Sequence, residues 1–372
     1  MSTCLLMSFF VIVTVVGSAV TAISSSVQCI DEDGKPVDWY IIYKFPYLAT
    51  THQPLFGGYR YSVISSRTLD GWHLSPHNIT DTKNSIFAKT LAPFYDSGSS
   101  NRHLLYSVFY NDQPPESDDK QTVSNTYAHS KGLLVGDEHQ GFWLIHSVPH
   151  FAPASSSSYE YVNSGGRYGQ VAMCITLDSK NLAKVVSQNF LTSKPYVYHT
   201  NVPSDQNSEF GLAINKLIKK QWSTSKTFAD THLVSVGGQH FRSFYKSPSD
   251  HVDLYAGIVA PQFNSSLLVE SWRKNPGHPL DSDCSYPKTK VENVHNIAIH
   301  GFINSPEQGH FTYLDDHSKW AISEVGDQKN LVCLGDINRM ESQYKRGGGT
   351  TCITSPTVWK AFNTFVDSVD RC

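Results

Sequence analysis

The sequence carries little charge for its length. Only 17% of its 372 residues are Asp, Glu, Lys or Arg, and the formal net charge at pH 7 is −3. So small a charged fraction, beside 40% hydrophobic and 12% aromatic residues, excludes a disordered chain and a long coiled coil. A near-zero net charge gives no indication of nucleic acid binding at neutral pH. The composition instead predicts a folded protein with one large or two medium domains.

Several motifs of well-known enzyme classes are also missing. The sequence has no HExxH, no G-x-S-x-G and no P-loop, and no two cysteines lie within four residues of each other. His146 and His150 have the i, i+4 spacing of a helical metal site, as do His73 and His77, but a proline inside each pair disfavours a continuous helix. We therefore expect neither a bound metal nor a cofactor.

Long apolar runs are absent after the first 22 residues. Residues 1–22 contain the run LLMSFFVIVTVV, followed by the small residues Gly17, Ser18, Ala19 and Ala22. This pattern predicts a secretory signal peptide cleaved after Ala19 or Ala22, although it has no basic n-region. A signal anchor is the alternative, but the run is short for a membrane span. We expect a soluble mature chain without a membrane span.

Cysteine usage fits the secretory route. Cys4 would leave with the signal peptide, and six cysteines would remain. An even number of cysteines in an oxidising compartment predicts three disulfide bonds here, and 15 pairings of the six are possible. The sequons at Asn78 and Asn264 predict glycosylation on the same route. The six remaining cysteines are Cys29, Cys174, Cys284, Cys333, Cys352 and Cys372.

Two His-Ser-Lys triplets hold the residues best suited to chemistry. His129 and Lys131 precede one apolar run, and His317 and Lys319 precede another 188 residues later. In a strand, residues i and i+2 point to the same side, so each pair presents an imidazole beside an ammonium group. Two such pairs could bind one phosphate from both sides. A further basic pair, His240 and Arg242, is interpreted as a phosphate-facing or ordinary surface feature.

The apolar patterns predict an α/β fold with two similar halves. We expect a signal peptide at 1–22 and halves at 23–200 and 201–372, with the boundary near Lys194 to Ser208. Expected strands cover 37–46, 103–112, 168–177, 232–238, 253–260, 294–302 and 317–323, with a hairpin around Asp137. We expect four helices. The first is capped by Asp178 or Ser179, and the second runs from Glu209 to Trp222. The third runs from Asp336 to Tyr344 and ends at three glycines, and the fourth is capped by Ser355 and has Val358, Trp359, Phe362 and Val366 on one face.

Histidine content makes the charge sensitive to pH. Protonating all 17 histidines would change the formal charge from −3 to −3 + 17 = +14. A nearly neutral protein would thus become a polycation in an acidic compartment.

Seven blocks in order along the chain resemble the deoxyribonuclease II family of lysosomal acid endonucleases: VDWYIIYKFP, AHSKGLLV, GFWLIHSVPHF, HSKWAIS, LGDINR, KRGGGT and VWKAF. The resemblance covers essentially the whole mature chain. It implies a phospholipase-D-like fold in which two similar halves, each a β-sheet flanked by helices, contribute one His-x-Lys to a shared active site. It also implies disulfide bonds between Cys29 and Cys174, Cys284 and Cys372, and Cys333 and Cys352. Neither triplet is followed by the Asp and Gly-Ser of the wider phospholipase-D motif, which weakens the case for lipid hydrolysis.

The expected reaction is metal-independent hydrolysis of DNA. One neutral histidine attacks phosphorus, the other protonates the leaving oxygen, and Lys131 and Lys319 supply the positive charge. The sequence leaves open which histidine attacks, and we favour His129. His146 and Asn338 are further candidates for orienting the phosphate.

Family membership would give 3′-phosphate and 5′-hydroxyl ends, double-stranded DNA bound mainly through its phosphates as the partner, and a lysosomal or secreted location. The DNA would come from dead or engulfed cells or from ingested material. The alternatives are a phosphodiesterase for lipid or other phosphate esters, and a catalytically dead, secreted DNA-binding glycoprotein.

Overall fold

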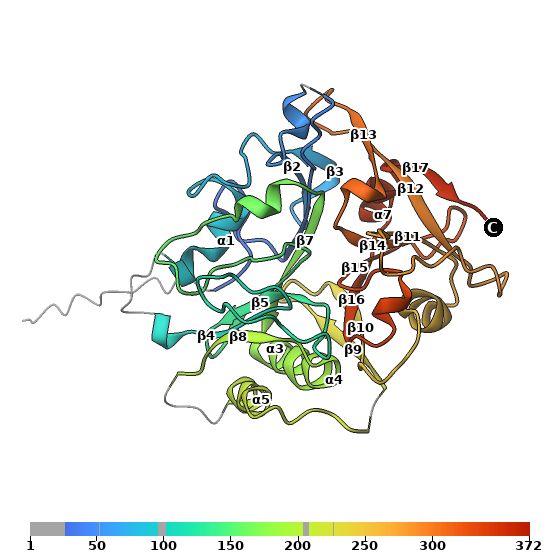
Figure 1. Cartoon of the computed structure of the whole chain (residues 1–372). Coiled ribbons are helices and arrows are strands. Elements are labelled where there is room, and N and C mark those ends of the chain that lie inside the picture. Colours follow the sequence, from blue (N-terminus) through green and yellow to red (C-terminus); the bar gives the residue numbers. More distant parts are fainter. Residues whose placement is uncertain (1–26, 52, 96–101, 204–207, 226) are drawn as a thin grey trace, which may run out of the picture.

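Two multi-stranded β-sheets lie face to face in this α/β protein, with the blue-to-green strands of the first sheet opposite the yellow-to-red strands of the second (Figure 1). The computed structural model describes residues 27–372 apart from 52, 96–101, 204–207 and 226. The signal peptide predicted at 1–22 lies outside the described residues. Within these ranges, no helix is long and apolar enough to cross a membrane.

The first sheet has eight strands in the order β3-β2-β1-β7-β6-β5-β4-β8, and every neighbouring pair is antiparallel. The hairpin predicted around Asp137 is its β5–β6 pair. The strands are β1 (Trp39–Lys44), β2 (Tyr61–Ser65), β3 (Thr68–Leu74), β4 (Tyr106–Asn111), β5 (Lys131–Gly136), β6 (Gln140–His146), β7 (Gln170–Asp178) and β8 (Val197–Asn201).

The second sheet has nine strands, in the order β13-β12-β11-β14-β15-β16-β10-β9 with β17 paired to β12. Only its β11–β12 pair is parallel. The strands are β9 (Phe228–Val234), β10 (His240–Lys246), β11 (Leu267–Ser271), β12 (Val291–Ile299), β13 (Gly309–Thr312), β14 (Lys319–Ser323), β15 (Leu331–Gly335), β16 (Gly348–Thr354) and β17 (Val366–Asp370).

The two sheets repeat one local order around the strand that begins with the triplet lysine. Lys131 opens β5 and Lys319 opens β14. The first sheet runs β4-β5-β6-β7-β1 and the second runs β11-β14-β15-β16-β10. Each lysine-bearing strand thus lies between a strand that precedes it in sequence and the strand that follows it.

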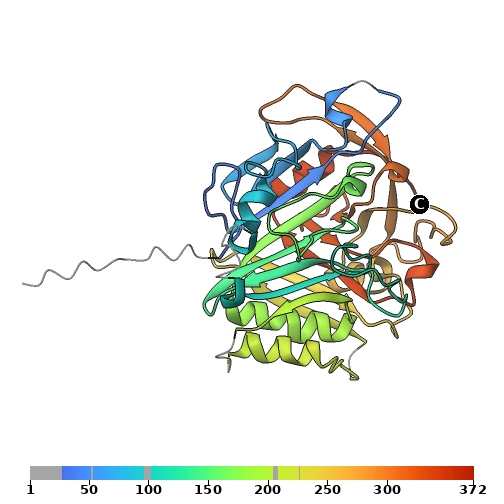
Figure 2. The same ribbon diagram turned by 60° about the vertical axis from the view of Figure 1, so that its left-hand side comes forward.

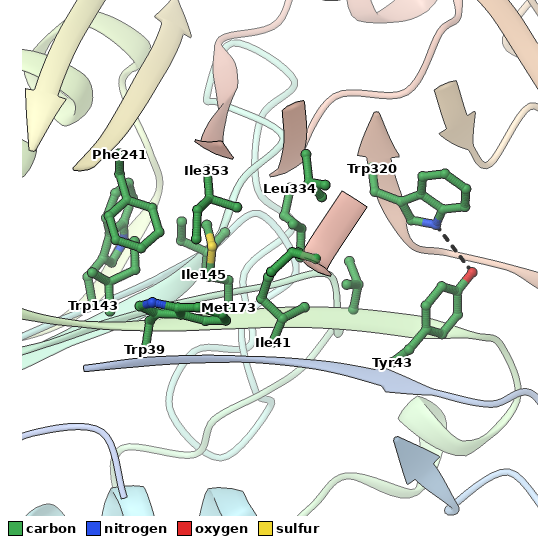
Figure 3. Packing of buried hydrophobic residues seen from close by; sticks show 14 of the residues in the cluster. Trp39, Ile41, Tyr43, Trp143, Ile145, Met173, Phe241, Trp320, Leu334 and Ile353 are labelled. Carbon is green, nitrogen blue, oxygen red and sulfur yellow. Dashed lines mark hydrogen bonds between the residues drawn. The ribbon is translucent and has the colours of Figure 1, made fainter. Parts of the chain in front are cut away.

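A common hydrophobic core joins the inner faces of the sheets (Figure 3). Alternate residues of β1, Trp39, Ile41 and Tyr43, point into it, as period-two side-chain alternation requires. Residues of the second sheet such as Trp320 meet them, and the Trp320 indole donates a hydrogen bond to the Tyr43 hydroxyl at 3.3 Å. Burial of this apolar surface holds the two sheets in a fixed relation.

Helices fill the ends of this core and cover the outer faces. In both views α3 and α5 lie together along the lower edge of the molecule (Figure 2). As predicted, Asp178 caps α3 by accepting from the Asn181 amide, and Ser355 caps α7 by accepting from Val358. The helices are α1 (Ile86–Tyr95), α3 (Ser179–Lys184), α4 (Leu191–Ser193), α5 (Glu209–Ile218), α6 (Ala260–Phe263) and α7 (Pro356–Thr364).

Residues 253–260, predicted as a strand, are helical. The Asp253 carboxylate accepts from the Tyr255 amide, and a π-helical turn, Tyr255–Val259, leads directly into α6. The apolar side chains of this segment pack on the outer face of the second sheet. The prediction was wrong because a short buried apolar run has no periodicity that separates strand from helix.

The helix predicted from Asp336 to Tyr344 is also wrong. Only a single 3₁₀ turn, Glu341–Gln343, forms there, and the glycines expected to end the helix begin β16. A Cβ on Gly349 would lie 2.2 Å from the Phe244 carbonyl oxygen, so this glycine serves close strand contact with β10. Two smaller corrections concern α5, which ends at Ile218, and Val366, which belongs to β17.

Three disulfide bonds are present, in the pairing that the family resemblance implies. Cys29 joins Cys174, Cys284 joins Cys372, and Cys333 joins Cys352. The first ties the N-terminal segment to β7, and the third links β15 to β16. Both sequon asparagines, Asn78 and Asn264, are exposed.

Candidate active site

His129 of the first sheet is held by loops of the second. Its backbone amide donates to the Gly347 carbonyl at 2.9 Å. Its ring Nδ1 lies 2.7 Å from the Asp336 carbonyl oxygen, which can only accept a hydrogen bond. Neutral His129 therefore carries its proton on Nδ1, and Nε2 keeps a free lone pair.

A buried carboxylate connects His129 to the cations around it. Asp112, directly after β4, forms an ion pair with Lys131, lies 3.1 Å from the Arg346 guanidinium and has an oxygen 3.9 Å from His129 Nε2. Burial raises the pKa of this carboxyl, but Lys131, His129 and Arg346 outweigh burial and hold it well below its usual value. Asp112 and Arg346 were missed from the sequence, although both lie in or beside the segments we singled out.

His317 lies between two aromatic rings. The Tyr168 ring stacks on the imidazole at 4.0 Å with an interplanar angle of 8°, and the Trp272 ring lies 4.2 Å away at 57°. The His317 amide donates to the Gly169 carbonyl at 2.9 Å, which again joins the two sheets. Its Nε2 is buried and has no hydrogen-bond partner within the described ranges. Neither Tyr168 nor Trp272 was predicted as a neighbour of His317 from the sequence.

Acidic groups lie behind the second triplet. Asp316 accepts hydrogen bonds from the Tyr43 and Ser318 hydroxyls, and Glu270 is fully buried. Burial raises the pKa of both carboxyls. Lys319 donates to the His317 carbonyl, and burial followed by repulsion from Lys131 lowers its pKa to about 7. Lys319 therefore keeps its positive charge in acid.

Both triplet histidines are neutral well into the acid range. Burial, followed by the charge of Lys131, lowers the pKa of His129 well below its usual value. Burial, followed by the charges of Lys319 and Lys131, lowers the pKa of His317 to about 2. Since each histidine also responds to the lysine of the other triplet, the two pairs lie within electrostatic range of each other. A bound phosphate would raise both pKa values, because its negative charge favours the imidazolium form.

These shifts correct the charge expected in acid. Burial also lowers the pKa of His146, to about 3, and that of His199. Three of the 17 histidines, His129, His146 and His317, thus resist protonation in the free protein, and the limiting charge falls from +14 to 14 − 3 = +11. The protein still becomes cationic in acid, but its triplet histidines do not contribute.

The two residues predicted to orient the phosphate lie near the triplets but differ in access. Asn338 lines the cleft described below, and its buried Oδ1 has no partner within the described ranges. His146 ends β6, where Nδ1 accepts from the Val148 amide at 3.2 Å and Nε2 is buried without a described partner. Its pKa responds to the charge of Lys131, which places it close to the first triplet.

A cleft of about 680 Å³ opens onto the first triplet. Its lining includes His129, Trp272, Lys274, Asn338 and Arg346. In the described part of the chain, no three His, Cys, Asp or Glu side chains are grouped so as to hold a metal ion. The third basic pair does not belong to the site, because the Arg242 guanidinium binds the Asp230 carboxylate at 2.6 and 2.8 Å.

Comparison with known sequences agrees with this arrangement. The sequence model of the deoxyribonuclease II family matches residues 28–372. The chain belongs to the deoxyribonuclease II family. It is 35% identical to deoxyribonuclease-2-beta of Rattus norvegicus, over 93% of both chains, and 33% identical to deoxyribonuclease-2-alpha of Sus scrofa, over 93% of this chain and 91% of the relative.

A third relative, cell death-related nuclease 6 of Caenorhabditis elegans, is 31% identical over 94% of this chain and 90% of its own. The predictions of the family and of a hydrolase of deoxyribonuclease II type are therefore confirmed. The blocks that carried the resemblance include both triplets and the loop of Asp336.

Asp336 allows a test of site electrostatics through stability. Burial raises its pKa to about 8, so the stability that this carboxyl contributes is fully present below its unfolded pKa near 4 and is lost as pH rises towards 8. The Asp336→Asn variant has no carboxyl to titrate at this position and serves as the reference. Between pH 5 and 7, we expect the unfolding free energy of wild type to fall by about 2 kcal/mol more than that of the variant. Urea denaturation at both pH values measures this difference.

Asp367→Asn, at an exposed carboxyl, is the matched control and should change stability by less than about 0.5 kcal/mol at either pH. If the difference in unfolding free energy between wild type and Asp336→Asn did not vary with pH, Asp336 would not be a buried, protonated carboxyl.

Proposed function

We propose that this protein is a metal-independent acid endonuclease that hydrolyses DNA to 3′-phosphate and 5′-hydroxyl ends. The observation that carries the proposal is the placement of two His-x-Lys pairs, one from each sheet, within electrostatic range of each other. We infer that the scissile phosphate binds between them. On this basis the fold is phospholipase-D-like, the halves 23–200 and 201–372 are its two repeats, and the active site is shared between them.

His129 is the nucleophile in this proposal. Its Nδ1–H donates to the Asp336 carbonyl, which leaves the Nε2 lone pair available for attack on phosphorus. Burial, followed by the charge of Lys131, lowers the pKa of His129, which favours the neutral ring with that lone pair free of a proton. The Nε2–P bond forms as the P–O5′ bond breaks, which leaves a phosphohistidine joined to the 3′ oxygen of the upstream fragment and releases the downstream fragment with a 5′-hydroxyl.

His317 is the general acid. In the free protein burial, followed by the charges of the nearby lysines, lowers the pKa of His317 and so disfavours the imidazolium. Because the bound phosphodiester is negative, it draws a proton onto His317 when the site fills, and acid solution supplies that proton. His317 then protonates the leaving O5′. In the second step neutral His317 takes a proton from a water molecule, and the water oxygen attacks phosphorus. The Nε2–P bond then breaks, which releases the 3′-phosphate end and restores neutral His129.

Lys131 and Lys319 supply the positive charge around the phosphoryl oxygens. Both ammonium groups are buried, at strand ends that fix their direction, so their field is strong and needs little reorganisation. His146 and Asn338 orient the phosphate, each with a buried polar atom that has no described protein partner.

The substrate is double-stranded DNA held mainly through its phosphates. Relatives named as deoxyribonucleases support this substrate, and one named as a cell death-related nuclease supports a role in degrading DNA of dead or engulfed cells. Ingested DNA is a further source in this proposal. Three disulfide bonds support a route through the secretory pathway, and the acid requirement supports the lysosome as the place of action.

Plasmid cleavage at pH 5 in EDTA tests the function. Because two lysines supply the charge, we expect nicking and linearisation at the same rate with EDTA or with added Mg²⁺, and 3′-phosphate ends by end-labelling. Activity that is lost in EDTA and restored by Mg²⁺ would refute metal independence. No cleavage in either buffer, with retained binding, would identify a dead nuclease fold.

A further inference from the structure

A second cleft lies on the other side of His317. It has a volume of about 780 Å³, and its lining includes Tyr47, Tyr59, Arg167, Tyr168 and Lys274. Lys274 also lines the cleft that holds His129, and Tyr168 is the ring stacked on His317. The two clefts therefore adjoin, and a strand whose phosphate lies between the histidines would continue into the second one.

The walls of this cleft are fixed before any ligand arrives. Buried Lys44 donates to the carbonyls of Gly166 and Tyr168, and the Tyr47 amide donates to the Arg167 carbonyl at 3.0 Å. These bonds hold the segment that carries Arg167 and Tyr168 against the loop after β1.

Glycine allows the Tyr59 ring to pack against the same segment. A Cβ on Gly166 would lie 2.9 to 3.0 Å from three atoms of the Tyr59 side chain, closer than real contacts allow. Because a rigid aromatic wall loses little conformational entropy when a ligand binds, the ligand is bound more tightly.

The lining combines the flat rings of tyrosines with the positive charges of Arg167 and Lys274. Tyrosine rings stack on the faces of nucleobases, and Arg and Lys bind the phosphates between them. Tyr47 is 57% exposed, so its ring is accessible to a base that enters the cleft. The guanidinium of Arg167 lies 5.3 Å from the centroid of the Tyr168 ring, beside the position where a base would stack.

We propose that the second cleft binds one unpaired nucleotide of the strand being cut, adjacent to the scissile phosphate. Its base stacks on the tyrosine wall and its phosphate lies beside Arg167 and Lys274. The base must be unpaired, because in a duplex its faces are covered by the neighbouring bases. The proposal of this subsite rests on the proposed function. It adds that the duplex opens locally at the cut.

An abasic scan tests the subsite in the wild-type protein. Single-stranded, end-labelled oligonucleotides, each with one stable abasic residue at a different position, are digested at pH 5 and the cut positions are resolved on a gel. We expect cutting to fall about tenfold at one fixed offset from the abasic residue, on the order expected for loss of one stacked base. An even ladder, or an intact single strand that stays uncut while an intact duplex is cut, would overturn the subsite. An intact duplex that also stays uncut would overturn the proposed function instead.

Three tyrosine variants assign the effect to the cleft. Tyr47→Ala should cut intact DNA about tenfold more slowly at low substrate concentration and should lose the gap in the abasic ladder. Tyr47→Phe, which keeps the ring, should retain the gap. Tyr286→Ala, at a 70% exposed tyrosine outside the cleft, should match wild type. A gap that persists in folded Tyr47→Ala would show that the base binds elsewhere.

Discussion

Alanine at His129 or at His317 is expected to lower DNA cleavage by about a thousandfold, because each variant removes one half of a nucleophile–acid pair. The double variant should be scarcely slower than either single variant, since two groups that act in one step are not additive. Single-turnover cleavage of a labelled duplex at pH 5 measures all three rates. The phosphohistidine intermediate should not survive an acid quench, because phosphohistidine hydrolyses in acid. An alkaline quench should therefore trap it, and the label should map to His129.

His232→Ala is the matched control for this pair. Its side chain is 74% exposed and lies on β9, away from both triplets. The control should cleave at the wild-type rate, and all variants should keep the wild-type melting temperature within a few degrees. Near-normal cleavage by either triplet variant would rule out the shared two-histidine site.

Asp112→Asn is expected to destabilise the protein by about 3 kcal/mol, because it leaves Lys131 and Arg346 buried without their counter-charge. The folded-state pKa of Asp112 lies below its unfolded value, so this stabilisation is present above pH 4 and is lost only as pH falls through the folded pKa. The loss in the variant should therefore be similar at pH 5 and pH 7. Urea denaturation at both pH values measures it.

Asp230→Asn provides the comparison for Asp112. Asp230 pairs with Arg242, but both side chains are about a quarter exposed, so its loss should cost less than about 1 kcal/mol. If the two variants lost the same stability, Asp112 would be an ordinary surface carboxylate rather than the centre of a buried ion-pair group.

Local chemistry accounts for the parts of the fold that the sequence predicted. Aromatic and β-branched runs such as 37–46 formed strands, and Asp178 and Ser355 capped helices, because these preferences depend on near neighbours. Residues 253–260 and 336–344 were misassigned because tertiary packing decides short apolar runs and buried loops. The strand β16 was missed since its glycines are required only by the strand beside it.

The candidate site divides in the same way. Its histidines and lysines were visible because the triplet repeats, and a repeated pattern is a property of sequence alone. Asp112, Tyr168 and Trp272 were not visible, because each becomes significant only through a residue more than a dozen positions away. A contact between His129 and the Asp336 carbonyl spans 207 residues and has no local signature.

That contact also sets when the enzyme can first act during its own synthesis. A ribosome adding about 5 to 20 residues per second needs roughly 10 to 40 seconds to pass from His129 to Asp336. Throughout that interval the inner face of the first sheet lacks the residues that cover it, and His129 lacks the carbonyl that orients its ring. On the proposed mechanism, the growing chain should therefore have no nuclease activity before Asp336 is added, and truncated products that end before Asp336 should be inactive towards DNA.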